Sequence, residues 1–418
     1  MLATLVSAWK IPELRKKMIF TLLMFFVFRI GSHIPVPGIN PLILEQLFTL
    51  EIFDFVGMLT GGAFDQVTIF AMGIIPYINA SIIVQLLTMV IPHFEQLAKQ
   101  GTEGRKKMNQ YIRFGAVGLG FLQAIAMSAY LNAGGAFLNP GFLSIFVAVI
   151  TLTAGTAFLM WLGELITEHG IGNGISLIIF AGIVSRLPGA VIGLFNQALH
   201  GDLDWLLLIL IAVLALGMIV GIVAVQEGQR RIPVQYAKRV VGRKVYGGQN
   251  THIPMKINQA GVIPVIFASA ILTFPSLLAS FFDGPVAGWF SRVFGFQHPV
   301  YVISYALLIF VFTYFYTAAT FNTADVADNM KKQGGFIPGL RPGKPTSEYL
   351  DKVLSRLTFS GATFLTFIAL MPTIFMAVSG LNLMLGGTSL LIAVGVALDT
   401  MKQVESHMLM RHYQGFMK

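Results

Sequence analysis

The sequence has few of the residue combinations that support covalent or metal chemistry. Its 8 histidines are scattered, and none belongs to a His-Glu-x-x-His pair of the kind that binds catalytic zinc. Cysteine is absent, which excludes disulfides, thiolate metal sites and cysteine nucleophiles. The glycine-rich stretch 170–174 lacks the Gly-x-x-x-x-Gly-Lys-Ser/Thr spacing that cradles a nucleotide. We therefore expect no enzymatic activity, no cofactor and no metal site.

Ionisable side chains are also rare inside the apolar stretches of the chain. The few such groups include Arg29, Glu164 near one end of its stretch, and Asp399 near the end of the last stretch. A proton- or sodium-coupled transporter usually buries a carboxylate or proton relay near the membrane midplane, and none is evident here. A secondary transporter with inverted repeats nevertheless remains an alternative, as does a membrane scaffold without any pathway.

The composition indicates whether the chain folds in water or in a lipid bilayer. Of 418 residues, 55% are hydrophobic and only 11% are charged, and the mean hydropathy is +0.75. A soluble globular domain carries about 25% charged residues, so this chain cannot cover a water-facing surface. We predict an all-α membrane protein. Apolar segments of spanning length lie near 18–35, 67–91, 114–131, 143–163, 174–193, 205–225, 259–281, 300–320, 357–377 and 387–401.

The distribution of positive charge predicts how ten such spans are oriented. If the connections alternate between two sides, all but three of the 28 Lys and Arg residues fall on one side, which the positive-inside rule identifies as cytoplasmic. The exceptions are Arg29, Arg186 and Arg292. Both termini are then cytoplasmic. Five spans in each half predict two inverted halves, residues 1–193 and 194–418, as in proteins with a site at the interface between their halves.

Helix breakers and one long apolar connection point to an interior pathway. Gly73 to Asn79, Gly170 to Gly174 and Ala260 to Pro264 open apolar segments with glycine or proline, and irregular backbone at membrane depth requires protein or a water-filled cavity beside it. Glycine and proline are also common in membrane helices, so packing is the alternative. The connection 40–66 contains no Lys or Arg and is too apolar for water. We expect it to re-enter the protein, or else to lie on the membrane interface.

Two long connections, about 226–257 and 321–356, are strongly basic. The positive-inside rule alone explains charge on this side. It does not explain the apolar residues between the charges, and these favour a docking surface for a large acidic or RNA-rich partner. The interleaved apolar residues are Val234, Tyr236, Val240, Val241, Phe336 and Ile337.

Several motifs, in matching order from about residue 10 to 405, resemble the SecY family, the channel subunits of the bacterial protein-secretion translocon. They are Lys10-Ile-Pro-Glu-Leu-Arg-Lys-Lys, Phe28-Arg-Ile-Gly-Ser-His-Ile-Pro-Val-Pro-Gly38, Ile75-Pro-Tyr-Ile-Asn-Ala-Ser, Trp161-Leu-Gly-Glu through Ser176, the 229–244 loop and Gly335-Phe-Ile-Pro-Gly-Leu-Arg-Pro-Gly343. The resemblance implies a ten-helix channel in which two five-helix halves enclose an hourglass pore. It implies transport of unfolded secretory polypeptide across the membrane and release of hydrophobic segments sideways into lipid.

The resemblance also implies roles for individual residues. The pore ring would consist of Ile74, Ile78, Ile179, Ile266 and Ile392. The plug would span about 52–66, with its residues Ile52, Phe53, Phe55, Val56, Met58, Leu59, Gly61, Gly62 and Phe64. Gly61 and Gly62 would serve as its hinge. Apolar, β-branched ring residues suit a seal that excludes water and ions without selecting a peptide sequence.

A lateral gate is implied between the second and third spans and the seventh and eighth. Gln85 and Asn258 match polar gate positions, where hydrogen bonds would favour the closed state, although such amides in membrane helices commonly only join neighbouring helices. The basic loops match those that dock the motor ATPase SecA and the ribosome. The docking residues implied are Arg230, Arg231, Lys238, Arg239, Arg243, Lys244 and Arg341.

Further partners follow from the same resemblance. A channel without a nucleotide site needs SecA or peptide elongation on the ribosome to drive the polypeptide. The small membrane subunits SecE and SecG are also expected, together with nascent chains, signal sequences and the lipid bilayer. The implied location is the bacterial cytoplasmic membrane.

Overall fold

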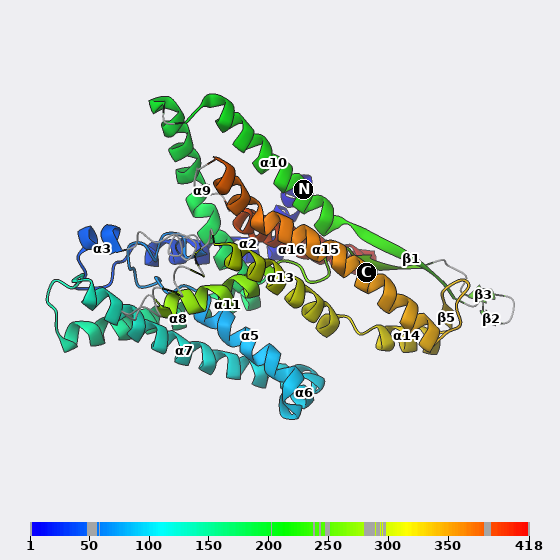
Figure 1. The fold of residues 1–418 in the computed structure, drawn as a ribbon. Coiled ribbons are helices and arrows are strands. Elements are labelled where there is room, and N and C mark those ends of the chain that lie inside the picture. Colours follow the sequence, from blue (N-terminus) through cyan, green and yellow to red (C-terminus); the bar gives the residue numbers. More distant parts are fainter. Residues whose placement is uncertain are drawn as a thin grey trace.

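The computed structural model describes residues 2–47, 57, 59–201, 203–236, 239–241, 244–246, 251–279, 289, 293, 295, 298–379 and 386–416. Long helices make up most of this part of the chain, and short strands gather at one end of the molecule, opposite α3 and the turn between α7 and α8 (Figure 1). The helices of the first half are α1 (Leu2–Trp9), α2 (Pro12–Gly31), α3 (Pro41–Leu47), α5 (Ile75–Val90), α6 (Pro92–Lys99), α7 (Gly101–Ala133), α8 (Phe142–His169) and α9 (Gly174–His200).

The second half carries its own helices and all of the strands. Its helices are α10 (Trp205–Glu227), α11 (Ile263–Ala279), α13 (Pro299–Thr320), α14 (Thr323–Lys332), α15 (Lys344–Ser379) and α16 (Gly387–Phe416). The strands are β1 (Gln229–Tyr236), β2 (Arg239–Val241), β3 (Lys244–Tyr246), β4 (Thr251–Lys256) and β5 (Gly335–Phe336). Strand β1 lies between β4 and β5 and is antiparallel to both.

Each of the ten predicted spans overlaps a helix, although the helices differ in how well they suit a bilayer. Among the described residues, 6 helices are long and apolar enough to cross a membrane, and the pair α5 and α6, bent by 97°, makes up to 7. The others are α2, α11 and α16. Charged residues occupy the start of α2 and the end of α16, and α11 has 17 residues. The structure thus contains multiple apolar spans, and the count of ten remains a prediction.

The helix breakers open helices where the sequence predicts. Pro76 lies in the first turn of α5, Asn173 caps α9 by accepting from the backbone N–H of Ser176 at 3.2 Å, and Pro264 lies in the first turn of α11. Pro188 lies inside α9 without ending it. Irregular backbone therefore lies directly before the first turns of α5, α9 and α11.

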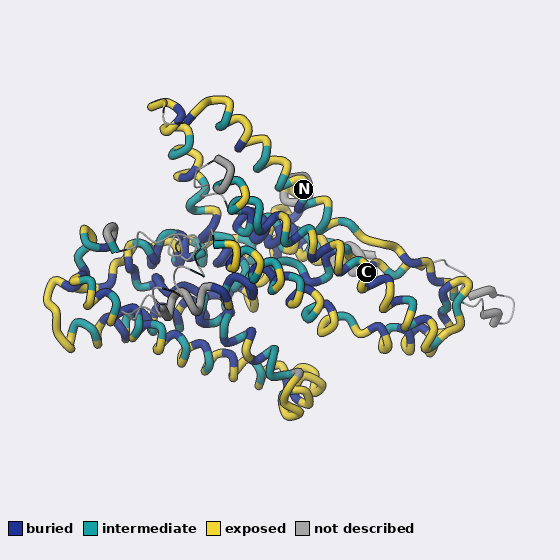
Figure 2. Tube along the Cα trace, in the orientation of Figure 1, coloured by how far each residue is buried: buried dark blue, intermediate teal, exposed yellow. Residues whose placement is uncertain are grey.

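Helix packing is densest within each half of the chain. Helices α5, α7 and α8 pack side by side in the first half, and α11, α13 and α15 do so in the second. The halves meet where α5 touches α11 and where α9 touches α16. Buried residues concentrate at the centre, whereas the hairpin of α9 and α10 projects with many exposed apolar side chains (Figure 2). Exposed apolar faces on membrane helices are explained by lipid contact.

Candidate pore and re-entrant segment

The five predicted ring isoleucines come together at the centre of the protein. They belong to α5 and the residue that caps it, to α9, to α11 and to α16, and all pack in one hydrophobic cluster. Ile74, Ile78, Ile179 and Ile392 are buried, and Ile266 is partly buried against them. Residues as distant in sequence as 74 and 392 thus share one core.

The space beside this cluster is small and apolar. A cavity of about 10 Å³ is lined by Ile74, Ile78 and Ile179 together with Leu59 and Thr60. Such a cavity has room for about one water molecule, and its mainly apolar walls give water few polar partners. The described side chains around this point are therefore closely packed and leave room for about one water molecule.

The connection after α3 re-enters the protein, as predicted for its described part. Residues 60–74 contain many buried side chains, including Thr60, Ala63, Phe64 and Thr68. We call residues 59–73 the re-entrant segment. Leu59 and Ala63 lie against the central cluster, whereas Phe64 packs in a second cluster with residues of α7 and α8. The predicted plug residues Ile52, Phe53, Phe55, Val56 and Met58 lie outside the described residues.

The backbone of the re-entrant segment is irregular. Gly61 and Gly62 have φ of +69° and +89°, which is left-handed backbone that glycine adopts without a steric penalty. The predicted hinge residues therefore occupy positions that need glycine, and hinge movement itself remains a prediction. Val67 has φ of +44°, a conformation that costs a β-branched residue about 1–3 kcal/mol. Its carbonyl accepts a hydrogen bond from the Val36 N–H at 3.0 Å, and this helps to fix the strained turn.

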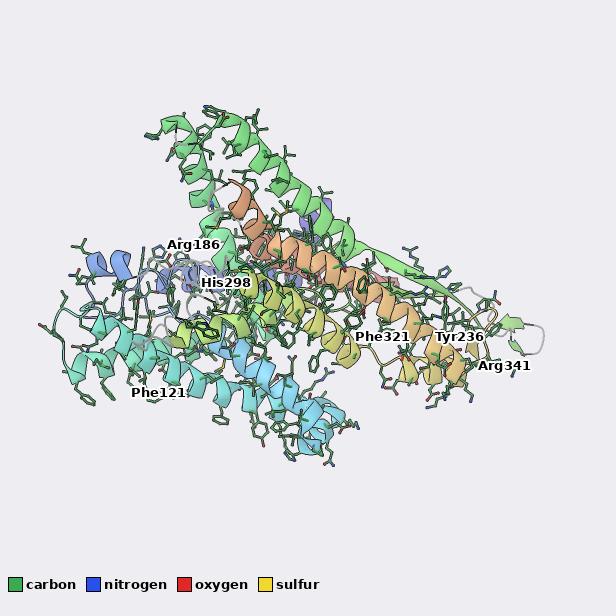
Figure 3. The ribbon with its side chains drawn as sticks, viewed as in Figure 1. Phe121, Arg186, Tyr236, His298, Phe321 and Arg341 are labelled. Atoms are coloured by element: carbon green, nitrogen blue, oxygen red, sulfur yellow. The ribbon has the colours of Figure 1, made fainter. Side chains whose placement is uncertain are left out.

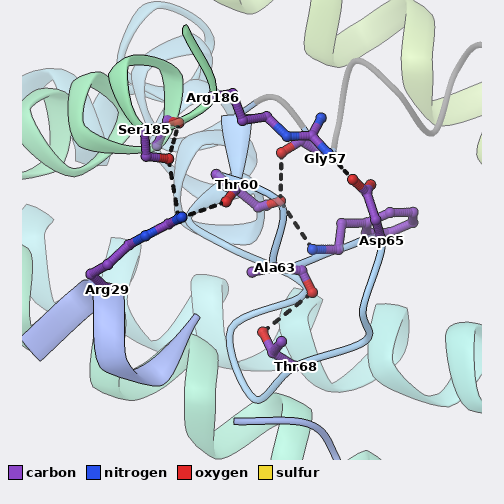
Figure 4. Close-up of polar contacts among 11 residues, drawn as sticks. Arg29, Gly57, Thr60, Ala63, Asp65, Thr68, Ser185 and Arg186 are labelled. Atoms are coloured by element: carbon purple, nitrogen blue, oxygen red, sulfur yellow. Dashed lines mark hydrogen bonds and ion pairs between the residues drawn. The ribbon is translucent and has the colours of Figure 1, made fainter. Parts of the chain in front are cut away.

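Two arginines fasten the re-entrant segment to neighbouring helices (Figure 4). The Nη1 group of Arg29 on α2 donates to the Gly61 carbonyl at 3.0 Å and to the Ser185 hydroxyl at 3.2 Å. Arg186 on α9 forms an ion pair with Asp65. Sequence analysis identified both arginines only as exceptions to the cytoplasmic charge pattern and assigned them no role. The only sign in the sequence that these arginines are unusual was their position outside the basic loops.

The two predicted gate amides bond to nearby residues, Gln85 within α5 and Asn258 within the connection between β4 and α11. Gln85 Nε2 donates to Ser81 Oγ at 3.3 Å on the same helix, and Asn258 Nδ2 donates to the Gly261 carbonyl at 2.9 Å. In the part of the chain that the structure describes, the buried Oδ1 atom of Asn258 has no hydrogen-bond partner. The seam between the predicted gate helices is formed where α5 contacts α11. Hydrogen bonds at these amides thus support local structure on either side of that seam.

The positions of the apolar residues in the basic loops contradict one prediction from the sequence, that these residues form a docking surface. We call β1, β4 and β5, together with α14 and the first turns of α15, the β platform. Val234 and Ile337 are buried in its core with Ile232 and Met255, so they do not provide a docking surface. For Val234 the reason is the period of two along β1, which turns alternate residues inward, whereas Ile337 directly follows β5, which pairs with β1. Tyr236 packs against the same core, and the side chains of Val240 and Val241 are not described.

The basic residues of the β platform remain on its surface. Arg230, Arg231 and Arg341 are exposed, and Figure 3 shows Arg341 and Tyr236 at the end of the molecule away from Arg186. Thr346 Oγ1 donates to the Arg341 carbonyl at 2.9 Å and so fixes the backbone that carries this arginine. The remaining predicted docking residues are not described in full. Lys238 and Arg243 lie outside the described residues, and Arg239 and Lys244 lie in β2 and β3 without described side chains.

The packing of the β platform core predicts how a substitution in it changes the stability of the platform. Replacing Ile232 with alanine should destabilise the platform by about 2–4 kcal/mol, because it removes a fully buried side chain from a small core. Limited trypsin digestion should then cleave after Arg230 and Arg231 faster than in the unmodified protein. Gln235→Ala, on the exposed face of the same strand, is the control and should not change the cleavage rate. Equal cleavage of both variants would contradict this core assignment.

Comparisons with known sequences agree with these features. The family model described as SecY matches residues 68–401. The chain is 49% identical over 430 residues to the protein translocase subunit SecY of Halalkalibacterium halodurans, with 100% of both chains covered. It is 47% identical over 417 residues to the same subunit of Escherichia coli K12, covering 97% of this chain and 94% of the relative.

Solved structures with the same fold are more distant in sequence. One described as the structure of a protein conducting channel has a TM-score of 0.65 and 20% identity, with 96% of each chain covered. A SecY structure described by its plug domain, which stabilises the closed state and maintains a membrane seal, has a TM-score of 0.64 and 20% identity, again with 96% covered on both sides. Sec61 in a canine ribosome-channel complex has a TM-score of 0.62 and 18% identity, also with 96% of each chain covered.

Proposed function

Since this chain belongs to the SecY family and is the protein-conducting channel of a Sec translocase, we propose that polypeptide crosses it through the central isoleucine cluster. Family membership excludes an enzyme, a secondary transporter and a scaffold without a pathway. The observation that carries the proposal is the convergence of five isoleucines from distant parts of the chain beside a small, mainly apolar cavity. The transported chain would be an unfolded secretory polypeptide.

The chemistry of this cluster suits a constriction that must seal and yet pass many sequences. Apolar walls disfavour water and ions, and they offer no directional hydrogen bonds that would retain a particular peptide. The β-branched side chains have few rotamers, so the resting seal is well defined. Opening requires the helices that carry the isoleucines to separate. Ile74, Ile78, Ile179, Ile266 and Ile392 would then surround the passing chain as a flexible ring.

The re-entrant segment would act as the plug of this channel. It supplies Leu59 and Thr60 to the cavity beside Ile78 and so occupies one side of the constriction. Residues 60–73 form turns, so no helix has to unfold there when the segment moves. A related SecY structure is described as one whose plug domain stabilises the closed state. We propose that the full plug spans about 52–66 and leaves the constriction when polypeptide enters.

Hydrophobic segments would leave sideways through the seam between α5 and α11. Residues 1–193 and 194–418 would form the two halves, hinged at the α9–α10 turn. Burying apolar surface in lipid releases about 25 cal/mol per Å², so a sufficiently apolar segment gains more in the bilayer than in the pore. Gln85 and Asn258 place polar amides near this seam. Separating α5 from α11 would expose these amides to the passing segment and thereby set how apolar it must be.

The energy for transport would come from partners that bind the basic side of the protein. The exposed Arg230, Arg231 and Arg341 offer positive charge to acidic protein surfaces or to RNA. We propose SecA and the ribosome as these partners. Sec61, a structural neighbour, is described in a ribosome-channel complex. SecE and SecG would complete the translocase in the bacterial cytoplasmic membrane, with both termini of this chain in the cytoplasm.

Site-specific photo-crosslinking tests the proposed path. A photo-reactive residue at position 78 or 266 should crosslink to a stalled secretory chain during transport into reconstituted vesicles. The same probe at position 85 should crosslink to the signal sequence of that chain. Probes at the exposed positions 192 and 209, on the apolar outer faces of α9 and α10, should not. Demonstrated transport without crosslinks from 78 and 266 would place the polypeptide elsewhere and refute the path.

A further inference from the structure

Two of the three cationic residues outside the predicted cytoplasmic loops contact the re-entrant segment. Arg29 lies near the end of α2, and Arg186 lies inside the long helix α9. A charged side chain within a membrane segment is costly, and such residues usually have a functional partner. Both arginines direct their guanidinium groups at one short stretch of irregular chain, residues 61–65 (Figure 4). This shared target needs an explanation beyond helix packing.

The contacts of Arg29 link three parts of the protein. Its Nη1 group donates to the Gly61 carbonyl at 3.0 Å and to the Ser185 hydroxyl at 3.2 Å, while Ser185 donates onward to the Gly182 carbonyl at 2.8 Å. Within the described residues Arg29 has no carboxylate partner. Its charge is therefore stabilised in part by a backbone carbonyl of the re-entrant segment, a contact that is lost if the segment moves away.

The contact of Arg186 is an ion pair with Asp65. The two side chains are only 22% and 36% exposed, so water screens this pair less than it would a surface pair. Asp65 is the acidic residue of the described re-entrant segment. Removal of one partner would leave a half-buried charge, which favours release of the segment into a more polar environment.

Close backbone contact makes this attachment specific to one position of the segment. A Cβ atom on Gly182 would lie 2.6 Å from the Leu59 carbonyl oxygen, so the segment approaches α9 where that helix has no side chain. Thr60 Oγ1 donates to the Gly57 carbonyl at 3.2 Å and accepts from the Phe64 N–H at 3.2 Å, which keeps the short loop compact. The segment therefore fits against α9 as a folded unit between the two arginines.

We propose that Arg29 and Arg186 form a two-point latch that fastens the re-entrant segment to α2 and α9 in the resting channel. The inference rests on the proposed plug role of that segment and adds the residues that control its release. Opening must break the Arg29–Gly61 hydrogen bond and the Arg186–Asp65 ion pair together. The latch joins the plug to two helices of the first half, so a movement of α2 relative to α9 separates the two points and weakens both contacts.

Thiol labelling of a single introduced cysteine measures release of the segment. The chain has no cysteine, so Ala63→Cys, at a fully buried position of the segment, provides a unique reporter. In reconstituted vesicles we expect Arg186→Glu or Asp65→Arg to raise its labelling by a membrane-impermeant maleimide about tenfold, which corresponds to about 1.4 kcal/mol. Arg29→Gln should raise it in the same direction.

The charge-swapped double variant Arg186→Glu with Asp65→Arg is the decisive comparison. It should return the labelling rate to near that of the reporter alone, and this rescue also shows that the variants fold. Lys402→Glu, which breaks the exposed 2.8 Å pair with Glu227 between α16 and α10, is the matched control and should leave labelling unchanged. Equal labelling in all variants, or increased labelling without rescue by the swap, would overturn the latch.

Ion conductance of the same vesicles separates this inference from the plug proposal. If the single variants raise both labelling and conductance, the latch and the sealing role are both supported. If labelling rises and conductance does not, the latch stands and the sealing role of the segment is refuted. If deletion of residues 57–66 raises conductance while the single variants leave labelling unchanged, the plug proposal stands and the latch is overturned.

Discussion

Replacing Ile78 and Ile266 together with glycine should raise the resting ion conductance of the reconstituted channel by roughly 10- to 100-fold. Burial of each isoleucine side chain contributes about 1.5–3 kcal/mol to an apolar contact, and glycine removes the whole side chain. The two residues come from α5 and α11 and pack in the same central cluster. Loss of Ile78 enlarges a cavity that otherwise has room for about one water molecule, and loss of Ile266 removes a side chain packed against the same cluster, so water and ions should gain a continuous path. Planar-bilayer recording measures the effect.

A matched control separates loss of the seal from loss of helix stability. Ile192 and Ile209 are 59% and 63% exposed on the outer faces of α9 and α10, and replacing both with glycine weakens helices to a similar degree. This control should leave conductance near that of the unmodified channel. An unchanged conductance in the Ile78 and Ile266 variant, with the protein folded in the bilayer, would refute the assignment of these residues to the constriction.

Replacing Arg341 with glutamate should reduce SecA-driven transport of a secretory precursor by about tenfold or more. Reversal of a charge at the centre of a charged interface costs a few kcal/mol, because attraction becomes repulsion. Arg341 is exposed on a loop whose backbone is fixed by Thr346 at 2.9 Å, so the substitution should not disturb the β platform. Transport into vesicles at fixed SecA concentration gives the rate, and titration of SecA shows whether binding is weakened.

The control for this experiment reverses a charge outside the β platform. Lys107 is an exposed residue near the start of α7, and Lys107→Glu changes the net charge by the same amount. Transport should remain close to normal in this variant, and the trypsin digestion pattern of both variants should match the unmodified protein. Normal transport by Arg341→Glu would show that the exposed arginine is not a docking residue for the motor.

The interpretation of the basic loops shows where sequence reasoning reaches its limit. Alternation of apolar and basic residues is compatible with a docking surface and with a strand that covers a small core. Val234 and Ile337 belong to such a core because β1 pairs with β4 and β5, which come from distant parts of the chain. Arg230, Arg231 and Arg341 are exposed, as expected for charges that have to remain in water whichever way the strand faces, and their docking role stays a prediction.

The contacts of the re-entrant segment were beyond sequence reasoning for a related reason. Its apolar composition predicted re-entry, and the burial of its described part confirms this. The partners of Arg29 and Arg186 lie 32 to 156 positions away in sequence, and no local periodicity reports such pairs. The two arginines were visible only as exceptions to the charge pattern, which indicated that they were unusual without indicating what they bind.

The sequence by itself determined that this protein is embedded in a bilayer. It also determined which segments form its apolar helices and where irregular backbone interrupts them. Lipid supplies no hydrogen bonds to the backbone, so an apolar stretch that crosses the bilayer in contact with lipid forms a helix in this chain, and this is a local consequence of composition. Only the tertiary structure decided that α5, α9, α11 and α16 bring their isoleucines together and that two arginines hold the re-entrant segment beside them. Those contacts depend on the packing of helices far apart in the chain, and packing is a property of shapes in three dimensions that hydropathy does not encode.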